Sequence, residues 1–343
     1  MTFFARRLER GEKMYKENKN IISLLVFFAV ILITLSIKAP AFFTLQNLSD
    51  IVLNSSTVAI VALGMITVIL IGQIDVSVGA ILAICCAVTG MLAKAGLPVP
   101  VVVVASIAVG ALLGLINGSF VALLGLDAIV VTLGTLSIYR GLLILWTNGK
   151  WISGLPQEIL AIGQGKVFGI PIPVIIAGLV FIIMYLVLKY ASFGRNFYAV
   201  GSNSKAARLS GINVRRTQIN AFMINGALVG VAALIYATRF GGIQSNTGQG
   251  FEMTVIAAVV VGGASTLGGS GTALGTLLGS LLVSTIGTIL IFFNISAFWE
   301  QAVQGLIILL SVSLYAFGYK GMKIPMLSSK KGVSGNDKQN NKA

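Results

Sequence analysis

The chain contains no histidine, and its only two cysteines, Cys85 and Cys86, are adjacent within an apolar run. The missing histidine removes the commonest general base and metal ligand. Adjacent cysteines have neither metal-site spacing nor a separate disulfide partner. No cluster of acids, bases and nucleophiles takes their place, so the sequence predicts no catalytic residue, no metal site and no cofactor. We expect the cysteines to be packing residues and the chain not to be an enzyme.

Charge is also scarce, at 10% of the residues, whereas 56% are hydrophobic. A soluble domain carries roughly 25% charged residues. Apolar runs recur that are long enough to cross a hydrocarbon core of roughly 30 Å. The sequence therefore predicts an all-α integral membrane protein, in contact with lipid, with about ten transmembrane helices. The expected spans are 21–37, 51–71, 76–94, 99–124, 128–146, 173–188, 218–239, 254–263, 271–293 and 298–317.

Acidic residues are few, so the net charge is +14, and the basic residues gather before the first span, in one interior loop and after the last span. Clusters beside membrane spans follow the positive-inside rule and argue against nucleic-acid binding. We therefore expect a multi-pass protein of the bacterial inner membrane with both termini in the cytoplasm. The expected parts are a basic N-terminal segment (1–20), a transmembrane domain (21–320) with a cytoplasmic loop (192–216), and a disordered cytoplasmic tail (321–343).

A phosphate-binding loop is missing as well, because neither Gly149-Lys150 nor Gly165-Lys166 is followed by Ser or Thr. If ATP drives this protein, the ATPase is another chain. The expected external loop, 148–170, contains Trp151 but is too short for a binding domain. A solute must then be captured by a separate protein or within the helix bundle.

Glycine, in contrast, is abundant and regularly spaced within several spans. Glycines four residues apart share one helix face and allow close helix packing. The ladders on the fourth and ninth spans lie on helices of opposite direction, which suggests an inverted repeat of helices 2–5 and 7–10. The expected packing residues are Gly110, Gly114, Gly118, Gly226, Gly230, Gly271, Gly275 and Gly279.

Polar residues and glycines interrupt two membrane segments, at 71–79 and at 261–271. Irregular backbone at membrane depth requires protein or a water-filled cavity around it. One reading is a tight turn in which Asp75 and Ser77 cap the following helix. The other is a solute pathway. Its candidate residues are Gln73, Asp75, Ser77, Asn117 and Asn225.

The interior loop contains a short sequence with helical propensity, Lys205 to Leu209. Asn203 or Ser204 can cap its start, and Gly211 can end it. The pattern predicts a short helix between two spans, and on local features alone the segment is equally well a solvated surface loop.

This loop resembles the coupling segment of ABC importer permeases, in the branch that carries ribose, other monosaccharides and autoinducer 2 and is related to branched-chain amino acid permeases. The matching residues are Ala206-Ala207, Leu209, Gly211 and Ile212. Three further stretches are similar to that branch, and the resemblance covers roughly residues 47 to 310. These stretches are 72–79, 132–135 with 139–141, and 252–271.

The resemblance implies a permease subunit that forms the membrane pathway for a sugar or sugar-like solute of the ribose, rhamnose or autoinducer-2 type. It implies cytoplasmic ATP-binding subunits, a second permease, identical or related, and an extracytoplasmic solute-binding protein as partners. Residues 246–253 look most like autoinducer-2 and rhamnose permeases, whereas Gln73 stands where that branch usually has glycine. An ion-gradient-driven secondary transporter of a small polar solute is the alternative. The residues implied in ATPase coupling are Ala206, Ala207, Arg208, Leu209, Gly211 and Ile212.

Overall fold

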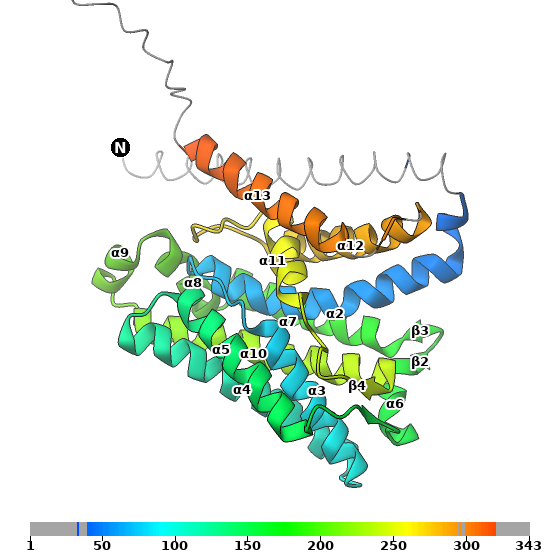
Figure 1. The fold of residues 1–343 in the computed structure, drawn as a ribbon. Coiled ribbons are helices and arrows are strands. Elements are labelled where there is room, and N and C mark those ends of the chain that lie inside the picture. Colours follow the sequence, from blue (N-terminus) through cyan, green and yellow to red (C-terminus); the bar gives the residue numbers. More distant parts are fainter. Residues whose placement is uncertain (1–32, 34–39, 294, 297–298, 320–343) are drawn as a thin grey trace, which may run out of the picture.

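The structure, a computed structural model, describes residues 33, 40–293, 295–296 and 299–319, which form a bundle of helices (Figure 1). Apart from Ile33, the first expected span lies outside the described residues, as do the basic segment 1–20 and the tail 321–343. The main helices are α2 (Leu45–Leu70), α3 (Val78–Lys94), α4 (Val99–Leu124), α5 (Ala128–Thr147), α7 (Ile172–Tyr190), α10 (Val214–Phe240), α11 (Phe251–Val261), α12 (Ala273–Phe292) and α13 (Trp299–Tyr319).

These helices lie at the positions of the other nine expected spans. By length and composition, six helices among the described residues are able to cross a membrane: α2, α4, α5, α7, α10 and α12. The predominantly helical structure and its membrane-length apolar helices agree with the predicted class, whereas the count of ten spans stays a prediction. The shorter elements are η1 (Pro40–Phe43), α6 (Gln157–Gln164), α8 (Ser192–Ser202), α9 (Ser204–Leu209), β1 (Ile152–Ser153), β2 (Lys166–Val167), β3 (Ile170–Pro171) and β4 (Gly242–Ile243).

Local sequence explains where several helices begin and end. Asp127 caps α5 by accepting hydrogen bonds from the backbone N–H groups of Ile129 and Val130. Asn213 caps α10 in the same way. Gly241 ends α10 in the left-handed conformation that glycine adopts without steric cost.

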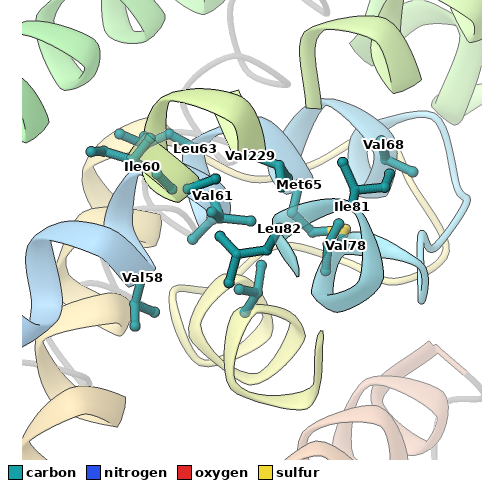
Figure 2. Close-up of a cluster of buried hydrophobic side chains, with 14 of the residues drawn as sticks. Val58, Ile60, Val61, Leu63, Met65, Val68, Val78, Ile81, Leu82 and Val229 are labelled. Atoms are coloured by element: carbon teal, nitrogen blue, oxygen red, sulfur yellow. The ribbon is translucent and has the colours of Figure 1, made fainter. Parts of the chain in front are cut away.

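Helix α2 forms the centre of the bundle, and every residue from Ser55 to Leu70 is buried. Helix α12 packs against one side of it and α10 against another (Figure 1). Figure 2 shows side chains of α2, such as Met65, packed with Ile81 and Leu82 of α3 and Val229 of α10. A helix that is apolar on all sides is expected in such a central position.

The glycine ladders face different neighbours. Gly110 and Gly114 of α4 lie against Gly226 of α10, so closely that a Cβ would overlap the opposite backbone. Gly275 of α12 lies in the same way against Gly262, at the end of the adjacent α11. One ladder thus joins the two halves of the chain and the other joins neighbouring helices within one half. The equivalence of the ladders, on which the sequence argument for a repeat rested, is not found.

The segment between α5 and α7 is a small ordered cap at one end of the bundle. Its α6 packs on α10, where Gln164 donates hydrogen bonds to the carbonyls of Thr238 (3.3 Å) and Arg239 (3.2 Å). Strand β1 pairs with β4 antiparallel, with Ile152 opposite Ile243. This pairing fixes the chain before α6 against the chain that follows α10.

Candidate functional site

The first helix break lies between α2 and α3, and it is organised around Asp75. Gly72 turns the chain with a φ of 76°. Asp75 is fully buried, and its Oδ1 accepts hydrogen bonds from the N–H (2.9 Å) and the hydroxyl (2.6 Å) of Ser77. Its Oδ2 accepts a hydrogen bond from the amide of Asn225 on α10 (3.0 Å). The buried carboxylate therefore has three donors, as burial of such a group requires.

The hydrogen bonds continue from Ser77 to two further helices. Asn117 of α4 donates to the Ser77 hydroxyl (2.7 Å), and Tyr139 of α5 donates to the side-chain oxygen of Asn117 (3.1 Å). We call Asp75, Ser77, Asn117, Tyr139 and Asn225 the polar network. It joins the α2–α3 break to α4, α5 and α10.

Four of the five candidate pathway residues thus belong to this one network. The fifth, Gln73, lies apart and lines a separate cavity. As for capping, Ser77 occupies the N-cap position of α3, but its side chain makes no capping bond. Tyr139 was missed as a site residue, although it lies in one of the stretches that resemble the permease branch.

Two cavities lie on either side of this break. The α10–α11 cavity, of about 630 Å³, lies where α10 gives way to α11, and its wall includes Trp151 and Gly248. The α4–α9 cavity, of about 450 Å³, is lined by Gln73, the end of α4, and residues of α9 and the start of α10. Gly79 of α3 packs directly on Gly248 and Glu252. The 73–79 segment therefore runs from one cavity to the floor of the other.

Arg140 of α5 holds the loop that forms this floor. Its guanidinium donates hydrogen bonds to the carbonyls of Ser245 (3.1 Å) and Thr247 (2.7 Å). Tyr139 and Arg140 are consecutive, so one turn of α5 contacts both the polar network and the loop before α11. The resemblance noted at residues 139–141 thus falls on a structural junction.

The short helix expected in the interior loop is present as α9. Asn203 caps it by accepting a hydrogen bond from the N–H of Ala206 (3.0 Å), and Gly211 follows with a φ of 83°. Leu209 is 90% exposed, whereas Ala207 is only 5% exposed and packs inside its own chain. Ala207 thus does not lie on the exposed face of α9.

A second cluster, the glycine junction, joins α8 to both helix breaks. It consists of Gly72, Gly201, Gly268 and Gly269. The N–H of Gly269 donates a hydrogen bond to the carbonyl of Leu70 at the end of α2 (2.9 Å). Gly201 packs against Leu70 and Gly269, and Gly268 packs against Gly72. A Cβ at Gly201 would overlap backbone atoms, so the three segments meet through their main chains.

A bundle with two interrupted helices and a cavity on each side of the break is the arrangement of a membrane transporter. The family of branched-chain amino acid transport system permease components matches residues 47–312, and the chain belongs to this family. It is therefore a multi-pass membrane permease, as the sequence motifs indicated.

Three relatives illustrate its place within the family, and each is an autoinducer 2 import system permease protein LsrC. The protein of Enterobacter sp. strain 638 is 39% identical over 298 residues, covering 87% of this chain and 86% of the relative. That of Klebsiella pneumoniae is 40% identical over 286 residues, covering 82% and 83%. That of Escherichia coli K12 (strain DH10B) is 38% identical over 297 residues, covering 87% and 86%. No solved structure matches the chain significantly.

Proposed function

We propose that this chain is the permease subunit of a bacterial ATP-binding-cassette importer for autoinducer 2 or a similar sugar-like solute. The identity of 38–40% to autoinducer 2 import permeases, over more than four-fifths of the chain, carries this proposal. Since the sequence has no phosphate-binding loop, the ATPases are separate cytoplasmic subunits. The other partners are a second permease, identical or related, and an extracytoplasmic solute-binding protein.

The basic loop 192–216 supports a cytoplasmic position for its end of the bundle, because basic loops favour the cytoplasmic side of the membrane. In this orientation, which also puts both termini inside, the α10–α11 cavity faces outward. It receives solute from the binding protein, and the α4–α9 cavity releases it inward. The 73–79 segment and the polar network close the path between them. Transport then requires that α3 and α11 separate, which alternating stabilisation of two states accomplishes.

Helix α9 is the segment that contacts the ATPase in this proposal. Its exposed Leu209 fits an apolar groove on a partner, with Ala206, Arg208, Gly211 and Ile212 around it. Helix α8 precedes α9 directly and ends in the glycine junction. Movement of α9 is thereby transmitted through main-chain contacts to the end of α2 and to the loop between α11 and α12.

We further propose ten spans and an inverted repeat of α2–α5 and α10–α13, the helices numbered 2–5 and 7–10 in the sequence-based count. The pattern of helix contacts supports this repeat. Helix α3 packs against α4 and α5, and α11 packs correspondingly against α12 and α13. Across the halves, α10 packs against α4 as α2 packs against α12. Each of these helix contacts in one half of the chain thus has a counterpart when α2–α5 are replaced by α10–α13 and the reverse.

Reconstitution tests this function. The chain is assembled in vesicles with its ATPase and solute-binding partners, and uptake of autoinducer 2 is measured. We expect uptake that requires ATP, fails with a hydrolysis-deficient ATPase and persists when ion gradients are dissipated. Uptake that follows an imposed ion gradient without ATP would instead establish the secondary transporter.

A further inference from the structure

The α10–α11 cavity has a composition that suits one class of ligand. We propose that it is a binding site for a neutral polyhydroxylated solute, held between the indole of Trp151 and the side-chain amides of Gln244, Asn246 and Gln249. This site rests on the proposed function and goes beyond it, because it places solute recognition in the permease itself.

Strand pairing builds the aromatic wall. Because β1 pairs with β4, Trp151 lies over Gly242, where a Cβ would collide with the indole. Phe240, at the end of α10, lines the same cavity and is exposed, as Trp151 is. Flat aromatic faces offer an apolar surface of fixed geometry to the C–H faces of a sugar-like ring.

Amides form the polar wall. Gln244, Asn246 and Gln249 lie in the loop before α11, and all three are exposed in the cavity lining. Each amide supplies two N–H donors and a carbonyl acceptor. Hydroxyl groups also both donate and accept, so a set of amides satisfies several adjacent hydroxyls at once.

The opposite wall is held in place by its own hydrogen bonds. Gln304 of α13 is buried, donates to the carboxylate of Glu300 (3.0 Å) and accepts from the hydroxyl of Thr254 (3.2 Å). The hydrogen bond from Thr254 joins α11 to α13 at the cavity, and the bond to Glu300 lies within α13. The wall is therefore formed before a ligand enters.

Charge excludes other classes of ligand. Among the described residues that line the cavity, Glu300 is the only acidic one, and none is basic. A phosphate, or the carboxylate of an amino acid, would lose water here without gaining a positive partner. The site thus disfavours the amino acids for which the family is named. Its volume, about 630 Å³, is in the range of small-molecule pockets.

Thiol protection tests the site. In a chain with Cys85 and Cys86 replaced by alanine, Gln301→Cys places a reporter on the cavity lining, and Ser153→Cys places one nearby but outside it. The assembled complex in lipid nanodiscs is treated with a polar thiol reagent and graded autoinducer 2, D-ribose, D-ribose 5-phosphate or L-leucine. We expect autoinducer 2 to slow labelling at position 301 saturably and at least threefold, with no effect at position 153. We expect no protection from the phosphate or from leucine.

A tryptophan pair supplies the matched control. Trp151→Ala should raise the half-protecting concentration about tenfold, because the variant loses the aromatic face that contacts the solute ring. Trp146→Ala should leave it unchanged, because Trp146 is exposed but does not line the cavity. Unchanged labelling of Ser153→Cys in both variants shows that the fold is intact.

Uptake by the same complex separates the two proposals. If neither neutral solute protects position 301, or if leucine and the phosphate protect equally, the site is wrong even when ATP-driven uptake is normal. If a neutral solute protects position 301 from labelling in a Trp151-dependent way while ATP-driven uptake is absent, the binding site is supported and the proposed function is contradicted.

Discussion

At the scale of single residues, the carboxylate of Asp75 accepts three hydrogen bonds while it is fully buried. Its donors come from the turn itself and from α10. Asn225, the donor on α10, keeps a side-chain oxygen with no partner. This geometry favours a structural tie over a proton carrier, which would need access to water in one of its states.

Asp75→Ala should therefore be far more harmful than Asp75→Asn. Alanine leaves buried donors unpaired, at about 1–3 kcal/mol each. Asparagine at position 75 keeps one acceptor oxygen for Ser77. If the Asn225 amide flips, its side-chain oxygen, which has no partner in the native chain, can accept a hydrogen bond from the new amide group at position 75. We expect Asp75→Asn to fold with a modest drop in melting temperature and partial uptake, and Asp75→Ala to be poorly expressed. A well-folded Asp75→Asn chain with no uptake at all would contradict this and favour proton coupling.

The sequence predicted which residues were unusual here, but not their partners. Asp75, Ser77, Asn117 and Asn225 stood out as polar positions in apolar surroundings. That they form one network depends on the rotation of α4 and α10 about their axes. Single-sequence patterns do not determine this rotation, because α10 carries polar and small residues on several faces. Gln73 was grouped with them by proximity in sequence, although the turn at Gly72 directs it to the other cavity.

At the scale of helices, glycine sets how closely α4 and α10 approach. A side chain at Gly114 would overlap the carbonyl of Phe222, which is main chain and cannot rotate away. Small residues at such contacts let helix backbones pack in a membrane without a hydrophobic driving force.

Gly114→Leu should thus separate the two helices and lower the thermal stability, whereas Gly178→Leu on α7 should not. Nothing lies within 4 Å of a Cβ built at Gly178. Overpacking costs about 1–3 kcal/mol even where side chains can adjust, and here the obstacle is backbone. Protein level and melting temperature in detergent measure the difference. Equal behaviour of the two variants would show that the α4–α10 contact does not limit stability.

The exposed side chain of α9 gives a second test at this scale. Leu209→Glu should fold normally, but the amount of ATPase that co-purifies with it should fall about tenfold or more. A leucine that is fully buried at a contact contributes about 1.5–3 kcal/mol. Lys205→Ala, on the same helix, is the control. Ala207→Glu, by contrast, should lower stability itself, since that position is buried. Normal ATPase recovery with Leu209→Glu would remove α9 from the contact.

Helix positions were the part of the fold most accessible from sequence. The expected span 99–124 coincides with α4, because Pro98 precedes it and Gly125 ends it. The partners of the helices were less accessible. Identical glycine spacing on α4 and α12 suggested equivalent roles, yet spacing says only that one face is smooth and not which helix covers it.

At the scale of the whole molecule, the distribution of charge predicts the orientation. Single cysteines replacing Lys205 and Ser153, in a chain with Cys85 and Cys86 replaced by alanine, are exposed to an impermeant thiol reagent on intact cells. Lys205→Cys should stay unlabelled until the cells are opened, and Ser153→Cys should react at once. The reverse pattern would show that the protein has the opposite orientation in the membrane, and the roles of the two cavities would then be exchanged.

The main-chain hydrogen bond from the N–H of Gly269 to the carbonyl of Leu70 allows opening of the glycine junction to be followed by amide exchange during transport. An amide proton held in this way exchanges with deuterated water only when its bond opens. If the glycine junction parts once in each turnover, deuterium uptake in residues 262–272 should accelerate with ATP and solute and slow again with a hydrolysis-deficient ATPase. Mass spectrometry of that peptide measures this exchange rate. An exchange rate indifferent to ATP would mean that α2 and the loop before α12 move together as one rigid unit.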